Sequence, residues 1–176
     1  MKKTLLSSAL VAIMATAFVP TTQAATSGTI NFTGRVLADS CTINVNGAGA
    51  TVVLPNVSTA AFGAAGSVAG ATPFTIALTG CDTNTTQASM TFTAGSTIDS
   101  TTGNLKNTAS SGSDVQIQLL NSGNSAINTA TNANAPVIAV TGGSGSTSLT
   151  AQYVATGATT SAGLVTSTVG FTLTYQ

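Results

Sequence analysis

The alternation of polar and apolar residues is most regular near the end of the chain, over residues 165–175. From Val165 to Tyr175 every second residue is apolar except Ser167, and the residues between them are threonine or glycine. A period of two is typical of a β-strand with one face on a core. The predicted strand ends one residue before the sequence does. We therefore expect something other than a following segment of the chain to lie beside this strand at its second edge.

A second alternating stretch lies near the N-terminus, within residues 25–36. Every second residue from Gly28 to Val36 is apolar or glycine, and the residues between are polar. From Leu37 to Val45 the apolar residues occupy odd positions instead of even ones. A shift of one residue exchanges the two faces of a strand, so the pattern predicts two elements separated by a bend. A single first strand interrupted by a bulge is the alternative that the pattern leaves open.

Shorter segments of the same kind recur between these two ends, separated by loops rich in glycine, serine, threonine and asparagine. No helical periodicity follows residue 24, and Phe62 is the large apolar residue of the loop 56–72 that we expect to pack inward. Short strands at this spacing predict an all-β sandwich. The predicted strands are 51–54, 74–78, 90–94, 115–119, 137–140 and 149–155.

Residues 1–24 have the features of a secretory signal peptide. Two lysines precede an apolar run from Leu5 to Val19, and small residues precede the predicted cleavage site after Ala24. A transmembrane anchor is the alternative, but the run is shorter than the roughly 20 apolar residues that span a membrane. We expect export and cleavage, with cleavage after Ala25 as a second option, and no membrane insertion of the remaining chain.

The chain after residue 24 carries few charges and no histidine. Arg35 and Lys106 stand against four aspartates, which gives this part a net charge of −2. Nucleic-acid binding is not expected without a basic patch, and a serine–histidine–aspartate triad requires a histidine. Asp82 and Asp114 are the remaining candidates for a carboxylate pair, although separate loop carboxylates are the simpler interpretation. No calcium-loop or phosphate-loop pattern is present, so we expect no enzyme, no metal site and no cofactor.

Cys41 and Cys81 are the two cysteines of the chain. An even cysteine count in an exported chain predicts one disulfide bond. Free thiols or metal ligands are the alternative, which the lack of histidine and the wide spacing of the two residues disfavour.

With both ends considered, the chain resembles the major pilin subunits of chaperone–usher fimbriae and is similar to type 1 pilins. Three segments carry the resemblance: one around the first cysteine, one before the second, and one at the C-terminus. The spacing of Gly163 and the penultimate Tyr175 is specific to that family, whereas a signal peptide and a cysteine pair are not. The segments are 28–36 with Cys41, 53–55 with 74–81, and 149–153 with 163–175.

The resemblance implies an incomplete immunoglobulin-like β-sandwich that lacks its C-terminal strand and is completed by donor-strand exchange. Residues 1–24 would be the signal peptide, 25–36 an N-terminal donor-strand arm and 37–176 the pilin domain. The implied function is a structural subunit of a bacterial surface fimbria that supports cell adhesion. The implied partners are a periplasmic pilus chaperone, an outer-membrane usher and other copies of the chain or related pilins. The implied location is the cell-surface fimbrium, reached through the periplasm.

The resemblance also assigns roles to residues at both ends. Apolar side chains of the arm are expected to enter the groove of the next subunit, and Gly28 to leave one pocket shallowly filled. The apolar face of the last strand is expected to line that groove, and the terminal carboxylate to be bound by chaperone cations. The donor residues are Gly28, Ile30, Phe32, Gly34 and Val36. The groove and chaperone-binding residues are Gly163, Val165, Val169, Phe171, Leu173, Tyr175 and Gln176.

Two alternatives accompany this interpretation. A minor or adaptor pilin would share these features, whereas a tip adhesin is disfavoured because the arm directly follows the signal peptide. A secreted autonomous β-sandwich that binds carbohydrate belongs to another class of protein. Such carbohydrate sites usually present aromatic platforms, and this chain has no tryptophan and only 5% aromatic residues.

Overall fold

The computed structural model describes residues 29–34, 41–47 and 50–176. The chain divides into two units, Met1–Arg35 and Val36–Gln176. The predicted signal peptide, the predicted bend at 37–39 and the arm residues Gly28 and Val36 lie outside the described residues. Residues 29–34 are exposed and form no regular secondary structure.

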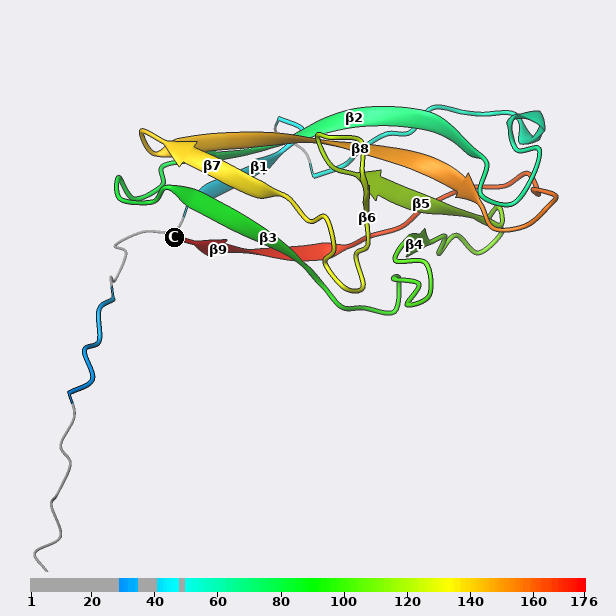
Figure 1. Ribbon diagram of the computed structural model, residues 1–176. Coiled ribbons are helices and arrows are strands. Elements are labelled where there is room, and N and C mark those ends of the chain that lie inside the picture. The colour runs from blue at the N-terminus through cyan, green and yellow to red at the C-terminus, as the bar shows by residue number, and fades with distance from the viewer. Residues whose placement is uncertain (1–28, 35–40, 48–49) are drawn as a thin grey trace, which may run out of the picture. The chain divides into compact units, whose positions relative to one another are not determined.

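The second unit is built of β-strands, as the sequence predicts, and the described residues contain no α-helix (Figure 1). A single turn of 3-10 helix covers Thr59–Ala61. Nothing helical among the described residues is long and apolar enough to cross a membrane. The strands are β1 Thr42–Val45, β2 Val68–Thr79, β3 Gln87–Thr93, β4 Leu105–Lys106, β5 Val115–Leu120, β6 Ala126–Ile127, β7 Val137–Thr141, β8 Ser144–Ala155 and β9 Gly170–Tyr175.

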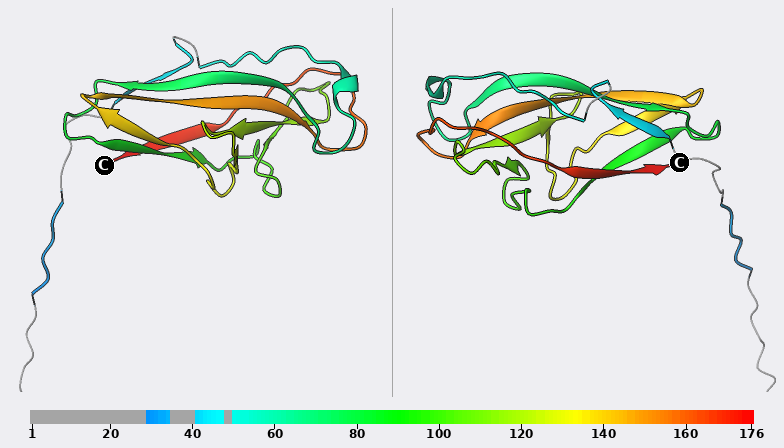
Figure 2. Two further views of the ribbon diagram at one scale, coloured as in Figure 1. Left: turned by 45° about the horizontal axis from the view of Figure 1, so that its top comes forward. Right: turned by 180° about the vertical axis from the view of Figure 1, so that it is seen from behind.

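The strands form two layers that face each other across a core (Figure 2). In the first layer β8 lies between β2 and β5, β1 extends the layer beside β2, and the short β4 and β6 pair with β5. In the second layer β3 lies between β7 and β9. The β7–β8 hairpin connects the layers, and every strand pair is antiparallel.

The core is filled by alternate residues of the long strands. Phe74, Ile76 and Leu78 of β2 face Met90 and Phe92 of β3, and all five are at most 9% exposed. Their period of two is what the sequence shows, and burying such side chains is the main favourable term in folding. Phe62 is also buried, as predicted, in a second cluster of buried residues with Val115, Tyr153 and Ala155.

Several strand boundaries differ from the sequence-based ones. β2 begins at Val68, six residues before the predicted strand at Phe74. Its first part contains a bulge between Ala69 and Thr72, with Gly70 at a φ of 69°, and it also contains Pro73. Bulges, glycine and proline each interrupt the alternating pattern that marks a strand in sequence. β8 likewise begins at Ser144, five residues before the predicted strand at 149–155.

Two predicted strands are shorter than expected or absent from the pairing. The last strand is paired only from Gly170, because residues 164–168 bond to the 97–113 loop rather than to a strand. Residues 51–54 keep the alternating burial of a strand but pair with none in the described chain. The two segments concerned, 164–168 and 51–54, lie on opposite sides of one groove.

Cys41 and Cys81 form the predicted disulfide, with a Cα–Cα distance of 4.2 Å. The bond ties the start of β1 to the residue after the β2 strand end, across a sequence separation of 40. It therefore closes a long loop in the unfolded chain.

Replacing both cysteines by serine is expected to lower the free energy of unfolding by about 4 kcal/mol, the loop-closure entropy of a cross-link of this length. Urea unfolding of the variant beside the oxidised wild-type chain measures the difference, with residues 25–39 repeated after Gln176 through a short linker in both chains so that the expected groove is filled. The reduced wild-type chain is the control and should match the variant. Equal stability of oxidised and variant chains would contradict the prediction.

Candidate strand-binding groove

One edge of the final segment of the chain carries no partner strand. β9 pairs with β3 from Thr93 opposite Gly170 to Ala88 opposite Tyr175. Within residues 164–176, the carbonyl oxygens outside β9 that accept bonds from neighbouring loops all belong to even-numbered residues. The bonds are Ser113 N–H to Leu164 (3.1 Å), Thr108 N–H to Thr166 (2.8 Å), Thr97 Oγ1 to Thr168 (2.7 Å) and Thr86 N–H to Gln176 (2.7 Å).

Adjacent residues of an extended segment direct their N–H and C=O groups to opposite edges. The odd-numbered residues from Val165 to Tyr175 therefore direct theirs away from β3, where the described residues supply no strand. Open edges of this kind are templates for strand addition. The second edge predicted from the sequence is thus present and unpaired in the fold.

The side chains of the same residues are only half covered. All six odd-numbered residues from Val165 to Tyr175 are partly buried, and the even-numbered residues between them are exposed. By contrast, Met90 and Phe92 on the neighbouring β3 are 3% and 4% exposed. The apolar face of the last segment therefore contacts the core on one side and lacks a cover on the other.

The opposite wall of the space is the extended segment 50–57. Val52 and Leu54 are partly buried against the core, while Val53 between them is 79% exposed. In the part of the chain that the structure describes, no backbone hydrogen bond joins residues 51–57 to another segment. This wall thus also has strand-like burial without a strand partner.

The two walls enclose a groove with two cavities. The larger, about 570 Å³, lies between residues 50–54 and 167–171, and the smaller, about 480 Å³, lies between residues 54–59 and 160–165. Leu54 lines both, and both walls continue in sequence from one cavity to the other, so the cavities follow one another along the groove. Core residues form the floor of the larger cavity: Phe74, Ile76, Phe92, Leu105, Leu149 and Ala151.

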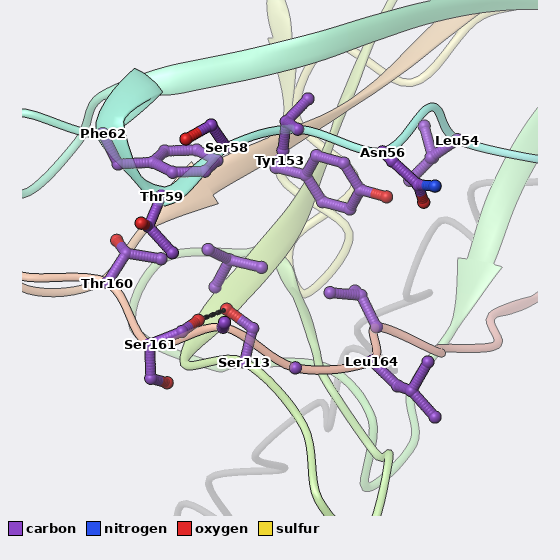
Figure 3. Close-up of a pocket in the computed structure, with 15 residues that line it drawn as sticks. Leu54, Asn56, Ser58, Thr59, Phe62, Ser113, Tyr153, Thr160, Ser161 and Leu164 are labelled. Atoms are coloured by element: carbon purple, nitrogen blue, oxygen red, sulfur yellow. Dashed lines mark hydrogen bonds between the residues drawn. The ribbon is translucent and has the colours of Figure 1, made fainter.

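The smaller cavity is more polar than the larger one. Figure 3 shows Phe62 and Tyr153 on one side of it and Ser113, Ser161 and Leu164 on the other. Ser113 Oγ donates a 2.6 Å hydrogen bond to the carbonyl oxygen of Ser161. Burial raises the pKa of the Tyr153 phenol above its usual value. The described lining contains no group of side chains arranged for catalysis.

Gly163 lies where the chain enters the groove wall. A Cβ atom there would lie 2.5 Å from the backbone N of Ser113 and 2.6 Å from the carbonyl carbon of Gly112. Real Cβ atoms do not approach backbone atoms so closely, so only glycine lets this segment lie against residues 111–113. Gly163 thus positions the groove wall at the smaller cavity, which it also lines.

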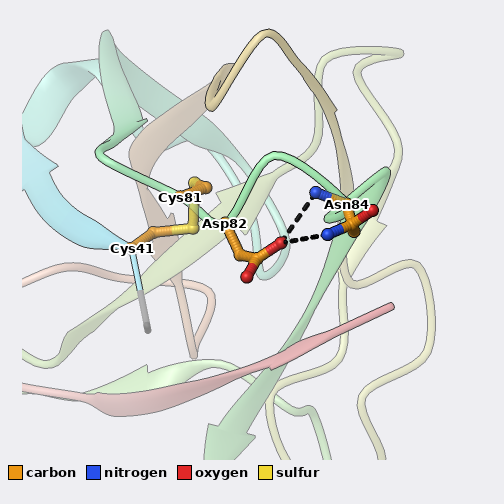
Figure 4. The surroundings of a disulfide bond; sticks show 4 residues. All are labelled: Cys41, Cys81, Asp82 and Asn84. Carbon is orange, nitrogen blue, oxygen red and sulfur yellow. Dashed lines mark hydrogen bonds between the residues drawn. A yellow bond between two sulfur atoms is a disulfide. The ribbon is translucent and has the colours of Figure 1, made fainter. Parts of the chain in front are cut away.

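Asp114 fixes the same turn through its carboxylate. Its Oδ1 accepts hydrogen bonds from the backbone N–H of Ser161 (2.8 Å) and from Ser161 Oγ (3.1 Å). The backbone bond from Ser161 lowers the pKa of the Asp114 carboxyl. Asp82 instead accepts bonds from Asn84 beside the disulfide (Figure 4). The two aspartates thus have separate partners, and the described residues form no metal-ligand cluster.

The C-terminal residue is held within its own domain. A terminal oxygen of Gln176 accepts bonds from the N–H groups of Thr86 and Gln87, and its side-chain Oε1 accepts a 2.6 Å bond from Gln87 Nε2. Gln176 N–H donates to the carbonyl of Gln87 in return. The predicted chaperone-binding carboxylate is therefore held in place beside Gln87, the first residue of β3.

The predicted donor residues that the structure describes are exposed. Ile30 and Phe32 are 79% and 88% exposed, and no atom lies within 4 Å of a Cβ built at Gly34. Sequence reasoning missed the groove residues Val52, Leu54, Phe62, Tyr153 and Ser167, although the alternation at residues 51–54 was visible.

The chain is similar to fimbrial proteins over most of its length. The family model described as fimbrial protein matches residues 30–176. The F17 fimbrial protein of Escherichia coli is 43% identical over 158 residues, covering 85% of this chain and 87% of that protein. The major fimbrial subunit SMF-1 of Stenotrophomonas maltophilia is 39% identical over 170 residues, covering 91% and 99%. The P pilus rod subunit PapA shares the fold, with a TM-score of 0.59 and 21% identity over 77% of this chain and 99% of that chain.

Proposed function

Since the chain belongs to the fimbrial protein family and is a structural subunit of a bacterial fimbria, we propose that it polymerises by donor-strand exchange. In this mechanism residues 25–36 of one copy fill the groove of the next. Addition of a strand to an open sheet edge is a known mode of recognition, and chaperone–pilin complexes are among its established examples. The observation that carries the proposal is the unpaired, half-covered edge of residues 165–175.

The arm supplies what the groove lacks. Ile30, Phe32 and Val36 offer apolar side chains on one face of the arm, and two cavities that follow one another along the groove would receive them. Burying each side chain contributes about 1.5–3 kcal/mol before ordering costs. Each new main-chain bond along the open edge adds about 0.5–1.5 kcal/mol. All of these contacts must open together, so dissociation of the joint is slow.

Before assembly the same edge requires protection, because an exposed apolar strand edge favours aggregation. A periplasmic chaperone would pair with residues 165–175 and bind the terminal carboxylate of Gln176, which Thr86 and Gln87 hold in place. At an outer-membrane usher, the arm of the next subunit would then replace the chaperone strand. The exported fibre supports adhesion at the cell surface, and the names of the relatives favour a major over a minor subunit.

A charge on the inward face of the arm is the direct test. Phe32→Asp is expected to abolish fibres on cells that express the subunit with its assembly machinery, because a carboxylate cannot enter an apolar cavity unpaired. Electron microscopy and the subunit ladder on gels of unheated cell extracts measure the loss. The matched control is Asn31→Asp, which adds the same charge to the other face and should leave fibres intact. Equal fibre yields from both variants would refute the proposal.

A further inference from the structure

Residues 164–168, the part of the groove wall that precedes β9, are held by a loop and not by a strand. β3 pairs with β9 only as far as Thr93 opposite Gly170. Before that point the same edge of the segment is bonded to the loop 97–113, which donates to the even-numbered carbonyl oxygens. The geometry of this half of the wall therefore depends on what fixes the loop against it.

Asn107 makes the central contact between the loop and the wall. Its Nδ2 donates hydrogen bonds to the carbonyl oxygens of Leu164 (2.7 Å) and Ser113 (2.8 Å). Its Oδ1 accepts hydrogen bonds from the backbone N–H groups of Thr166 (2.9 Å) and Ala109 (3.1 Å). A carboxamide has two N–H donors and one oxygen with two lone pairs, so this side chain uses its full bonding capacity.

Two of these four bonds cross to the wall, and two stay within the loop. The C=O of Leu164 and the N–H of Thr166 point to the same edge of an extended segment, where a neighbouring strand would pair with both. The Asn107 carboxamide thus takes the place of a backbone group in a strand that the described chain lacks at this point. The bonds to Ser113 and Ala109 hold the carboxamide in the orientation that the wall contacts require.

Gly112 leaves room for the Asn107 side chain. A Cβ atom built at Gly112 would collide with Nδ2 of Asn107 and would lie 3.0 Å from the carbonyl oxygen of Ala109. A side chain at position 112 would therefore displace the carboxamide from its place between the loop and the wall.

We propose that Asn107 is a positioning residue of the strand-binding groove, whose carboxamide holds residues 164–166 extended so that the opposite edge of the wall can accept a strand. This inference rests on the proposed function, since it names a residue that prepares the groove of that same joint. Asn107 is not among the residues that line the two cavities. It therefore acts through the backbone of the wall rather than by contact with the bound strand.

The two edges of the wall are coupled because adjacent residues of an extended segment bond in opposite directions. The bonds that Asn107 makes to Leu164 and Thr166 on one edge thus set the direction of the N–H and C=O groups of Val165 on the other. Val165 and Leu164 also line the smaller cavity. Loss of the carboxamide should disturb the strand-binding edge beside that cavity and leave β9, which β3 holds, in place.

Full-length variants expressed with the assembly machinery test this role. Asn107→Asp keeps the size of the side chain, but a carboxylate only accepts hydrogen bonds, so both bonds to the carbonyl oxygens of Leu164 and Ser113 are lost. Asn107→Ala loses all four bonds. We expect either change to lower the fibre yield at limiting subunit expression about tenfold. The matched control is Asn121→Ala, which removes three hydrogen bonds to backbone groups in a turn away from both cavities and should leave the yield unchanged.

Hydrogen exchange, followed by mass spectrometry on purified fibres, separates positioning from general stability. We expect the backbone amides of residues 164–168 to exchange at least tenfold faster in Asn107→Asp fibres than in wild-type fibres, and those of β9 to keep their wild-type rates. A general loss of stability would instead raise exchange across the whole domain. If the variant yields no fibres, a chain with residues 25–39 repeated after Gln176 through a short linker serves for the same measurement. Uniform acceleration, or unchanged rates in both segments, would overturn the inference.

A double-mutant cycle with Gly112 tests the contact between the two residues. Gly112→Ala should lower the fibre yield as the Asn107 variants do, because its methyl group displaces the carboxamide. In an Asn107→Ala background the same substitution should cost clearly less, since no carboxamide remains to be displaced. Equal costs in the two backgrounds would overturn the role of Asn107 and leave donor-strand exchange standing. Absence of fibres from the unmodified subunit, or fibres that form without the arm, would overturn the proposed function itself.

Discussion

A chain that carries a second copy of residues 25–39 after Gln176, joined through a short linker, is expected to be a soluble, stable monomer, whereas the unmodified mature chain is expected to aggregate. The appended copy would turn back along β9 and occupy its own groove as an antiparallel strand. Covering the three large apolar residues Ile30, Phe32 and Val36 is worth several kcal/mol. In a domain of this size we therefore expect the Tm to rise by about 10 °C or more.

Size-exclusion chromatography and thermal unfolding of the two purified chains measure the difference. The matched control carries the same appended segment with Phe32→Asp in the second copy, so length and composition are nearly unchanged. This control should behave like the unmodified chain. A stable monomer from the unmodified chain would contradict the incomplete fold and would favour an autonomous carbohydrate-binding sandwich.

The sequence predicts the parts of this fold whose signal is local. The alternation over residues 165–175 predicts the half-covered face, and the structure confirms it with partly buried residues at every odd position. The paired strand itself starts later, at Gly170, since the preceding residues are held by the 97–113 loop. The alternation of side chains follows burial, whereas a strand is assigned only where the backbone has a hydrogen-bonded neighbouring strand. Residues 165–169 show the alternation but have no such neighbour among the described residues.

The groove could be only half predicted, because its second wall depends on tertiary placement. Residues 51–54 resemble an ordinary short strand followed by Pro55, and nothing in their pattern shows that they lie across from residues 163–171. The need for glycine at Gly163 likewise comes from the backbone of residues 111–113, far away in sequence. Ser167 interrupts the apolar alternation, and its sequence position does not show that its hydroxyl is buried without a hydrogen-bond partner among the described residues.

Deleting residues 25–36 is expected to abolish fibres while leaving the groove able to bind a donor strand. Every described residue that lines the two cavities lies between Val45 and Phe171, so the deletion removes no part of the acceptor site. The truncated subunit should therefore still copurify with the proposed periplasmic chaperone. Electron microscopy of cells and affinity purification from periplasmic extracts measure the two properties. Fibres of normal length from the truncated subunit alone would exclude the arm as donor.

Coexpression of the truncated and full-length subunits separates loss of the donor from misfolding. In the proposed assembly, the arm of each new subunit fills the groove of the subunit added before it. A subunit with a groove but no arm can therefore accept the next arm and start a fibre, but it cannot be added to a fibre that already exists. Immunogold labelling of a tag on the truncated subunit should mark one end of each fibre and no interior position. A misfolded subunit would be absent from the fibres. Because each joint uses one arm and one groove, this placement at one end depends on the two ends of the chain acting on different neighbours.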